Sequence, residues 1–186
     1  MKKVILITLG VFTLSVSANS QKYFTKAGKI TFDATAASSP EQIEAVNRSA
    51  TAVIDTKTGA VQFSVLVKGF SFERALMEEH FNENYMESNK FPKSEFKGTI
   101  TNNSAVDYSK DGNYNIKVQG KLTIHGVTKD VTTDGKLVIQ GGKINATADF
   151  SVQLADYSIS IPGLVADKVG KSAKISVNCS LELFKG

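Results

Sequence analysis

The sequence is poor in the residues that form disulfides and metal sites. Its 186 residues include one cysteine, Cys179, and two histidines, His80 and His125. A single cysteine excludes an internal disulfide, so stability has to come from packing and hydrogen bonds. No two of these residues have zinc-ligand spacing, so we expect neither a metal nor a cofactor. Cys179 falls on the apolar face of an alternating stretch and is predicted to be a small buried side chain.

Motifs of common enzyme classes are missing as well. The chain has no Gly-x-Ser-x-Gly nucleophile elbow. Residues 163–172, GLVADKVGKS, end like a phosphate-binding loop, but six residues separate Gly163 from Gly170 and a strand pattern follows. Glu78 and Glu79 are neighbours on a predicted helix, where adjacent side chains do not face each other. We therefore predict no catalytic residue and favour a non-enzymatic protein.

The first residues resemble a secretory signal peptide. Lys2 and Lys3 precede an apolar run over 4–16, and the small residues Ala18 and Ser20 follow as candidate cleavage positions. The run is too short for a membrane span, which needs about 20 apolar residues. We predict that residues 1–20 are removed, that residues 21–186 form one domain, and that the protein is periplasmic or secreted.

The charge balance excludes one class of partner. The chain has 22 Lys and Arg against 18 Asp and Glu, and removal of Lys2 and Lys3 leaves 20 against 18, a net charge of +2. So small an excess does not indicate a nucleic-acid partner.

The sequence is rich in period-two alternation of apolar and polar residues. Such alternation is typical of antiparallel strands with one buried and one wet face. It predicts strands at 61–68, 114–125, 143–154 and 173–183, with shorter candidates at 28–34, 49–55, 95–101 and 131–139. About eight such strands without a second layer favour a closed barrel, which has no exposed edges and can hold one small ligand. A β-sandwich is the competing architecture.

One segment departs from this pattern. Met77, Phe81 and Tyr85 recur at four-residue spacing, which predicts a helix with one apolar side over about 71–88, near the barrel mouth. His80 would lie beside that apolar stripe, where it could bond backbone at the rim or meet a polar ligand head. Residues 38–47 are predicted to be a short helix or a loop.

His125 lies in the stretch GKLTIHGVTKDV, residues 120–131. It follows the polar face of its strand and precedes Gly126, so we predict a solvated or hydrogen-bonded histidine at a strand end. A role in ligand contact is the alternative.

These stretches resemble the YceI-like family of lipocalin-like polyisoprenoid-binding proteins. The similarity rests on GKLTIHGVTKDV, and on residues 78–98, 144–163 and 169–183 in the same order. It implies an exported, eight-stranded antiparallel barrel with an apolar tunnel for a polyisoprenoid or other long-chain lipid. His80 matches the helical histidine of that family.

The apolar faces above then predict the lining of the tunnel. The candidate lining residues are Phe63, Val65, Val67, Phe72, Met77, Phe81, Tyr85, Ile116, Val118, Leu122, Ile124, Phe150 and Val152, with His80 as the polar head-group contact. Transient membrane contact and a homodimer are further hypotheses. Two other functions stay open: an interaction or structural module with a filled core, and an enzyme acting on a bound lipid through His80 or His125.

Overall fold

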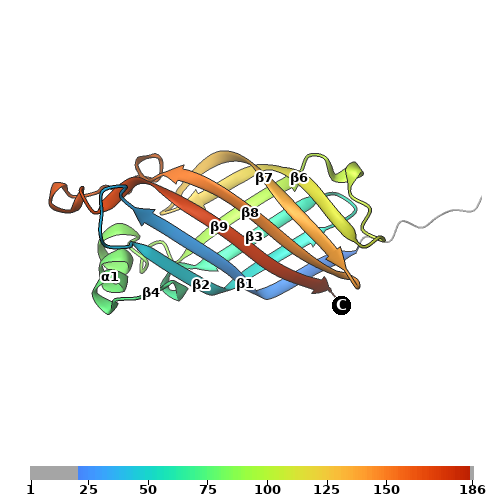
Figure 1. Ribbon diagram of the computed structural model, residues 1–186, viewed down its shortest axis with the longest axis horizontal. Helices are drawn as coiled ribbons and strands as arrows, with labels where there is room; N and C mark the ends of the chain where they lie inside the picture. The colour runs from blue at the N-terminus through green and yellow to red at the C-terminus, as the bar shows by residue number, and fades with distance from the viewer. Residues whose placement is uncertain (1–20, 185–186) are drawn as a thin grey trace, which may run out of the picture.

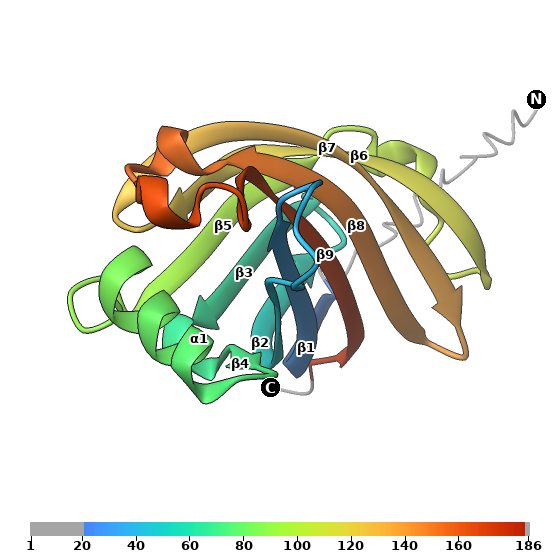
Figure 2. The same cartoon turned by 60° about the vertical axis from the view of Figure 1, so that its left-hand side comes forward.

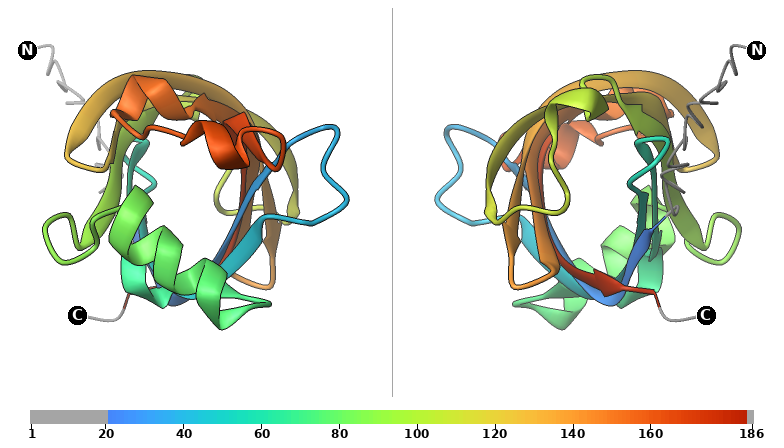
Figure 3. Two further views of the ribbon diagram at one scale, coloured as in Figure 1. Left: turned by 90° about the vertical axis from the view of Figure 1, so that its left-hand side faces the viewer. Right: turned by 90° about the vertical axis from the view of Figure 1, so that its right-hand side faces the viewer.

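The computed structural model describes residues 21–184, which form a closed antiparallel β-barrel (Figures 1 and 3). The predicted signal peptide, residues 1–20, lies outside the described residues. Hydrogen-bonded neighbours follow the order β1-β9-β8-β7-β6-β5-β3-β2, and β2 pairs back with β1 to close the ring. The strands are β1 (Lys22–Thr35), β2 (Glu44–Asp55), β3 (Ala60–Leu66), β5 (Lys93–Ile100), β6 (Gly112–Ile124), β7 (Val127–Gln140), β8 (Lys143–Gln153) and β9 (Val169–Leu183), with the two-residue β4 (Ser71–Phe72) added to β2.

This closure confirms the predicted eight-stranded barrel and excludes the sandwich. On β6, Ile116 and Val118 are buried while Asn115 and Lys117 are exposed, as the alternation predicts. Strand β1 is longer than the predicted 28–34. Its register shifts between Thr25 and Gly28, and this irregularity interrupts the alternation that would have revealed the first half of the strand.

The helical segment is shorter than predicted. It consists of α1 (Ala75–His80) and a continuing π-helical turn, η2 (Phe81–Tyr85), rather than the whole of 71–88. Ser71 and Phe72 instead extend the sheet, because their backbones pair with β2. After η2, Glu87 has a positive φ of 43°, which ends the helical conformation. Among residues 21–184, no helix is long and apolar enough to cross a membrane.

Three segments frame one end of the barrel, which we call the mouth (Figures 2 and 3). They are the α1–η2 helix, the β1–β2 loop at residues 36–43, and the connection from β8 to β9. The first half of the predicted 38–47 element is therefore a loop, and its second half begins β2 at Glu44. The connection contains two 3-10 turns, η4 (Leu154–Tyr157) and η5 (Gly163–Val165).

The buried side chains form two clusters along the barrel axis. The mouth cluster includes Phe70, Phe81 and Tyr157, and the far cluster includes Ile54, Leu137 and Leu181. Val106 and Tyr108 from the β5–β6 connection pack into the far cluster, next to the 3-10 turn η3 (Asn103–Ala105). The Tyr108 hydroxyl donates a hydrogen bond of 2.8 Å to Asn103 Oδ1.

The wall of the barrel is interrupted at the mouth end between β7 and β8. These strands pair only between residues 135–140 and 143–148. Beyond that point η4 packs against both strands, and the Thr133 hydroxyl donates a long hydrogen bond of 3.4 Å to the Asp149 carbonyl. The chain that follows β8 therefore turns inward and completes the wall.

Candidate ligand-binding cavities

Inward-facing side chains enclose an inner cavity of about 160 Å³ within the barrel. Because successive strand side chains point to opposite faces, one apolar position in every two reaches this space. The predicted residues Phe63, Val65, Ile116, Val118, Leu122, Ile124, Phe150 and Val152 line it, together with Ile30, Phe96, Leu137, Ile175 and Val177 from the remaining wall. Within the described residues, the interior is hollow rather than filled.

A second, outer cavity of about 370 Å³ lies at the mouth. It is bounded by the α1–η2 helix, the mouth ends of β1 and β9 and the β8–β9 connection, and its lining includes the predicted residues Phe72, Met77, His80, Phe81 and Tyr85. His80 is exposed, and its ring forms no hydrogen bond with any of residues 21–184. The rim bond that we considered for His80 is thus not formed in this part of the chain.

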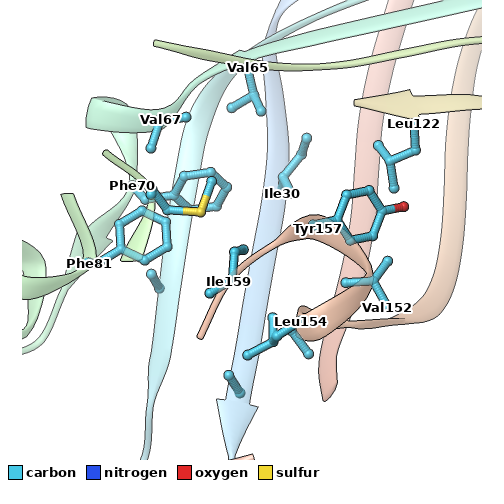
Figure 4. Packing of buried hydrophobic residues seen from close by; sticks show 14 of the residues in the cluster. Ile30, Val65, Val67, Phe70, Phe81, Leu122, Val152, Leu154, Tyr157 and Ile159 are labelled. Carbon is cyan, nitrogen blue, oxygen red and sulfur yellow. The ribbon is translucent and has the colours of Figure 1, made fainter. Parts of the chain in front are cut away.

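Phe81 lies on the boundary between the two cavities and lines both. Its ring contacts three others, with centroid distances of 5.0 Å to Phe72, 5.6 Å to Phe32 and 5.8 Å to Phe70. Figure 4 shows Phe81 and Phe70 side by side, facing Ile159. Phe32, Met86, Leu154 and Ile159 also line both cavities, so the boundary between the two spaces is apolar and only partly aromatic.

Sequence reasoning misplaced one lining residue and missed others. Val67 is 1% exposed and packs in the mouth cluster, but it lines neither cavity. Leu154, Tyr157 and Ile159 face the interior from the β8–β9 connection (Figure 4). The apolar positions change from even-numbered residues in β8 to odd-numbered residues after Leu154, so the sequence marks the end of the strand but not the inward turn, which Ser158 completes with a left-handed φ of 58°.

Charged side chains gather on the rim of the outer cavity. Glu41, in the β1–β2 loop, forms an ion pair with Arg74, which precedes α1. The same carboxylate lies 3.6 Å from the ammonium of Lys168, in the β8–β9 connection. Glu41 therefore joins the three segments that frame the mouth. The two cations border the outer cavity, whereas none of the described lysines or arginines lines the inner cavity.

His125 and Gly126 form the two-residue turn between β6 and β7. Both have positive φ, 49° and 74°, which is the conformation of the tight turns that match the twist of a hairpin. A Cβ on Gly126 would also clash with the Phe91 ring, so both the backbone conformation and the available space favour glycine at this position. The His125 ring is hydrogen-bonded, with Nδ1 3.1 Å from the Tyr157 carbonyl and Nε2 2.8 Å from Glu87. It lines neither cavity.

The structure does not bring the chemically reactive residues together. His80 borders the outer cavity, His125 is held at a turn, and Cys179 is fully buried in the far cluster. Burial raises the pKa of the Cys179 thiol to about 11, which disfavours a nucleophilic thiolate. Residues 21–184 contain no cluster of three or more His, Cys, Asp or Glu side chains suited to a metal ion.

Known structures share this architecture. A polyisoprenoid-binding domain from Saccharophagus degradans, described as implicated in plant cell wall breakdown, superposes with a TM-score of 0.75 at 12% identity, covering 89% of this chain and 100% of that one. Burkholderia cenocepacia BcnA superposes with a TM-score of 0.66 at 15% identity, covering 83% and 95%. A YceI protein of Campylobacter jejuni gives 0.52 at 16% identity, with both chains fully covered. No curated protein sequence matches the chain.

These likenesses establish the fold, and the family follows from the sequence itself. The sequence model of the YceI-like domain matches residues 8–181, well beyond the stretches that carry the resemblance. It includes the amino-terminal strands, where the alternation is least regular. The chain therefore belongs to the YceI-like domain family.

Proposed function

We propose that this protein is an exported carrier that holds a long apolar ligand, a polyisoprenoid or similar lipid, in its barrel. The observation that carries the proposal is the apolar inner cavity, which shares Phe81 and four other lining residues with the outer cavity. Burial of each CH2 group contributes about 0.8 kcal/mol, so a long hydrocarbon chain binds such walls without any special polar motif. Membership of the YceI-like family and the likeness to a polyisoprenoid-binding domain support the same assignment.

A variant that fills the cavity tests this function. Ala148 points into the inner cavity from β8, whereas Ser151 on the same strand is exposed. We expect Ala148→Phe to reduce lipid binding at least tenfold, and Ser151→Phe to bind as the wild type does. Native mass spectrometry of the purified protein should also show a bound lipid of several hundred daltons. A wild-type protein that carries no lipid and takes up no added isoprenoid contradicts the proposal.

Export is part of the proposal and rests on the amino-terminal sequence. Strand β1 begins at Lys22, so cleavage after Ala18 or Ser20 would leave every strand of the barrel intact. We expect the mature protein to begin between residues 19 and 21 and to fractionate outside the cytoplasm. Intact-mass measurement after cell fractionation checks both points, and a cytoplasmic protein that keeps Met1 would contradict export.

A further inference from the structure

Tyr157 is a buried tyrosine whose hydroxyl has no hydrogen-bond partner among the described residues. The residue is 3% exposed and lines the inner cavity. Figure 4 shows its hydroxyl between Leu122 and Val152, which both line the same space. No residue in the range 21–184 forms a hydrogen bond with this hydroxyl, and the oxygen is not sealed in by surrounding atoms. It therefore borders the open space of the cavity.

A buried hydroxyl without a partner is costly. Leaving a polar group unsatisfied in an apolar interior destabilises a protein by roughly 1–3 kcal/mol, and phenylalanine would fill the same volume without that loss. Two other tyrosine hydroxyls have protein partners: that of Tyr108 donates to Asn103, and that of Tyr114 donates to the Lys110 carbonyl at 3.1 Å. Among the described residues the hydroxyls of Tyr23 and Tyr85 also form no hydrogen bond, but neither residue lines the inner cavity. The backbone of Tyr157 is fixed by a hydrogen bond from His125 Nδ1 to the Tyr157 carbonyl oxygen, and this helps to position the ring.

The surroundings of the hydroxyl select the chemistry of its partner. Among the described lining residues of the inner cavity there is no lysine or arginine, and Glu95 is the one charged residue. An anionic group would therefore enter an apolar site without a countercharge, which is strongly unfavourable. The cations Arg74 and Lys168 border the outer cavity instead. Serines and threonines also line the inner cavity, but none of them is as buried as Tyr157.

We propose that the Tyr157 hydroxyl hydrogen-bonds a neutral oxygen of the ligand, an alcohol or a carbonyl, inside the barrel. This inference rests on the proposed carrier function and narrows it. The ligand is a long chain that carries an uncharged oxygen, and that oxygen lies in the inner cavity beside η4. A plain hydrocarbon would leave the hydroxyl unsatisfied, and a phosphorylated chain would place its charge at the mouth, away from Tyr157.

Three probes with one carbon skeleton test this proposal: farnesene, farnesol and farnesyl diphosphate, each displacing a fluorescent hydrophobic dye from the full mature protein. A neutral hydrogen bond corresponds to roughly three- to tenfold in affinity. We expect wild-type protein to bind farnesol tighter than farnesene by that factor. Tyr157→Phe should remove the difference while leaving farnesene binding unchanged.

Tyr108→Phe is the matched control, because it removes a hydroxyl that already has a protein partner in the far cluster. It should lower stability and keep the preference for farnesol. Tyr157→Phe should melt at the wild-type temperature or above, since no hydrogen bond within the protein is lost. If the wild type and Tyr157→Phe bind farnesol with equal affinity, the inference is overturned while the carrier function stands. The same holds if both proteins bind farnesyl diphosphate markedly tighter than farnesol. If no probe displaces the dye from the wild type, the carrier function itself fails.

Discussion

The Nε2 atom of His125 lies 2.8 Å from a carboxylate oxygen of Glu87, which connects the β6–β7 turn to the loop after η2. The other ring nitrogen, Nδ1, donates to the Tyr157 carbonyl in η4. The Phe91 ring packs edge-on against the imidazole at 4.7 Å. His125 thus fastens η4, and with it Tyr157, to the wall of the barrel.

Replacing His125 with asparagine should loosen this junction. Asparagine tolerates positive φ, so the turn is preserved while the side chain becomes too short to reach both partners. We expect the free energy of unfolding to fall by about 1–3 kcal/mol, the sum of the lost hydrogen bonds and ring contact. Glu87→Gln is the milder control, because an amide oxygen still accepts a hydrogen bond and Glu87 is partly exposed. Urea unfolding compares them; equal stability of His125→Asn and wild type would contradict the role.

Phe81 should be sensitive to charge. Phe81→Asp places a carboxylate among three aromatic rings, without a positively charged partner at that position, and we expect a loss of stability of about 3–5 kcal/mol or failure to fold. Asn84→Asp adds the same charge at an exposed position of the same helical segment and should be close to neutral. Thermal unfolding measures both. A Phe81→Asp protein with wild-type melting and lipid binding would show that this ring does not separate the cavities.

A softer change tests the passage itself. Phe81→Leu keeps the site apolar but shortens the side chain between the two cavities. We expect faster dissociation of a bound lipid with only a small change in folding. Stopped-flow transfer of a fluorescent lipid to vesicles gives the rate, and a rate equal to that of the wild type would contradict a barrier at Phe81.

The barrel could be predicted from the sequence because its determinants are local. In β6, each inward residue is two positions from the next, so alternation alone identifies Ile116, Val118 and Leu122 as inward-facing. The charged rim could not be found in this way. Glu41, Arg74 and Lys168 lie far apart along the chain, and only the closed topology brings them together.

Tyr157 was missed for a different reason. It lies just beyond β8, where the apolar positions change from even-numbered to odd-numbered residues, and the inward turn depends on the gap between β7 and β8 and on the bond from His125. That change of phase indicates where the strand ends, but it does not show whether the following residues turn into the barrel or away from it. For His125 the sequence predicted a solvated or hydrogen-bonded histidine beside a glycine turn, and the structure shows the hydrogen-bonded form, with two non-local partners.

Two facing glycines should be intolerant of any side chain. Gly98 and Gly120 are paired across β5 and β6, and a Cβ on Gly120 would lie 2.5 Å from the Gly98 Cα and 2.8 Å from the Phe96 ring. We expect Gly120→Ala to cost about 1–3 kcal/mol, because the strands or the ring must move. Gly163→Ala is the control, since a Cβ there meets no atom within 4 Å. Urea unfolding should leave Gly163→Ala within about 0.5 kcal/mol of wild type; equal losses in both variants would contradict the packing argument.

Alkaline pH should destabilise the fold through Cys179. Burial raises the pKa of its thiol from 9.0 to about 11, and the residue is fully enclosed in the far cluster. Below pH 9 the thiol is protonated in both the folded and the unfolded chain, so this contribution to stability is complete. Between pH 9 and 11 the unfolded chain releases the proton first, which favours unfolding. Linkage therefore predicts a fall of about 1 kcal/mol in the free energy of unfolding between pH 8 and pH 10.

Cys179→Ala isolates this effect, because it removes the titrating group. Burial also raises the pKa of Tyr108 from 10.0 to about 12 and raises the pKa of Tyr157, but both tyrosines are present in the two proteins and affect the two curves alike. Urea unfolding at pH 8, 9 and 10 should show that the free energy of unfolding depends less on pH in Cys179→Ala than in the wild type. Loss of the sulfur can also lower the stability of the variant at pH 8, but that difference is the same at every pH and does not affect the comparison of slopes. Parallel curves for the two proteins would mean that the thiol titrates alike in the folded and the unfolded chain. The thiol would then be more open to water than its packing indicates, since even a Cβ on the neighbouring Gly28 would lie only 2.6 Å from the Cys179 sulfur.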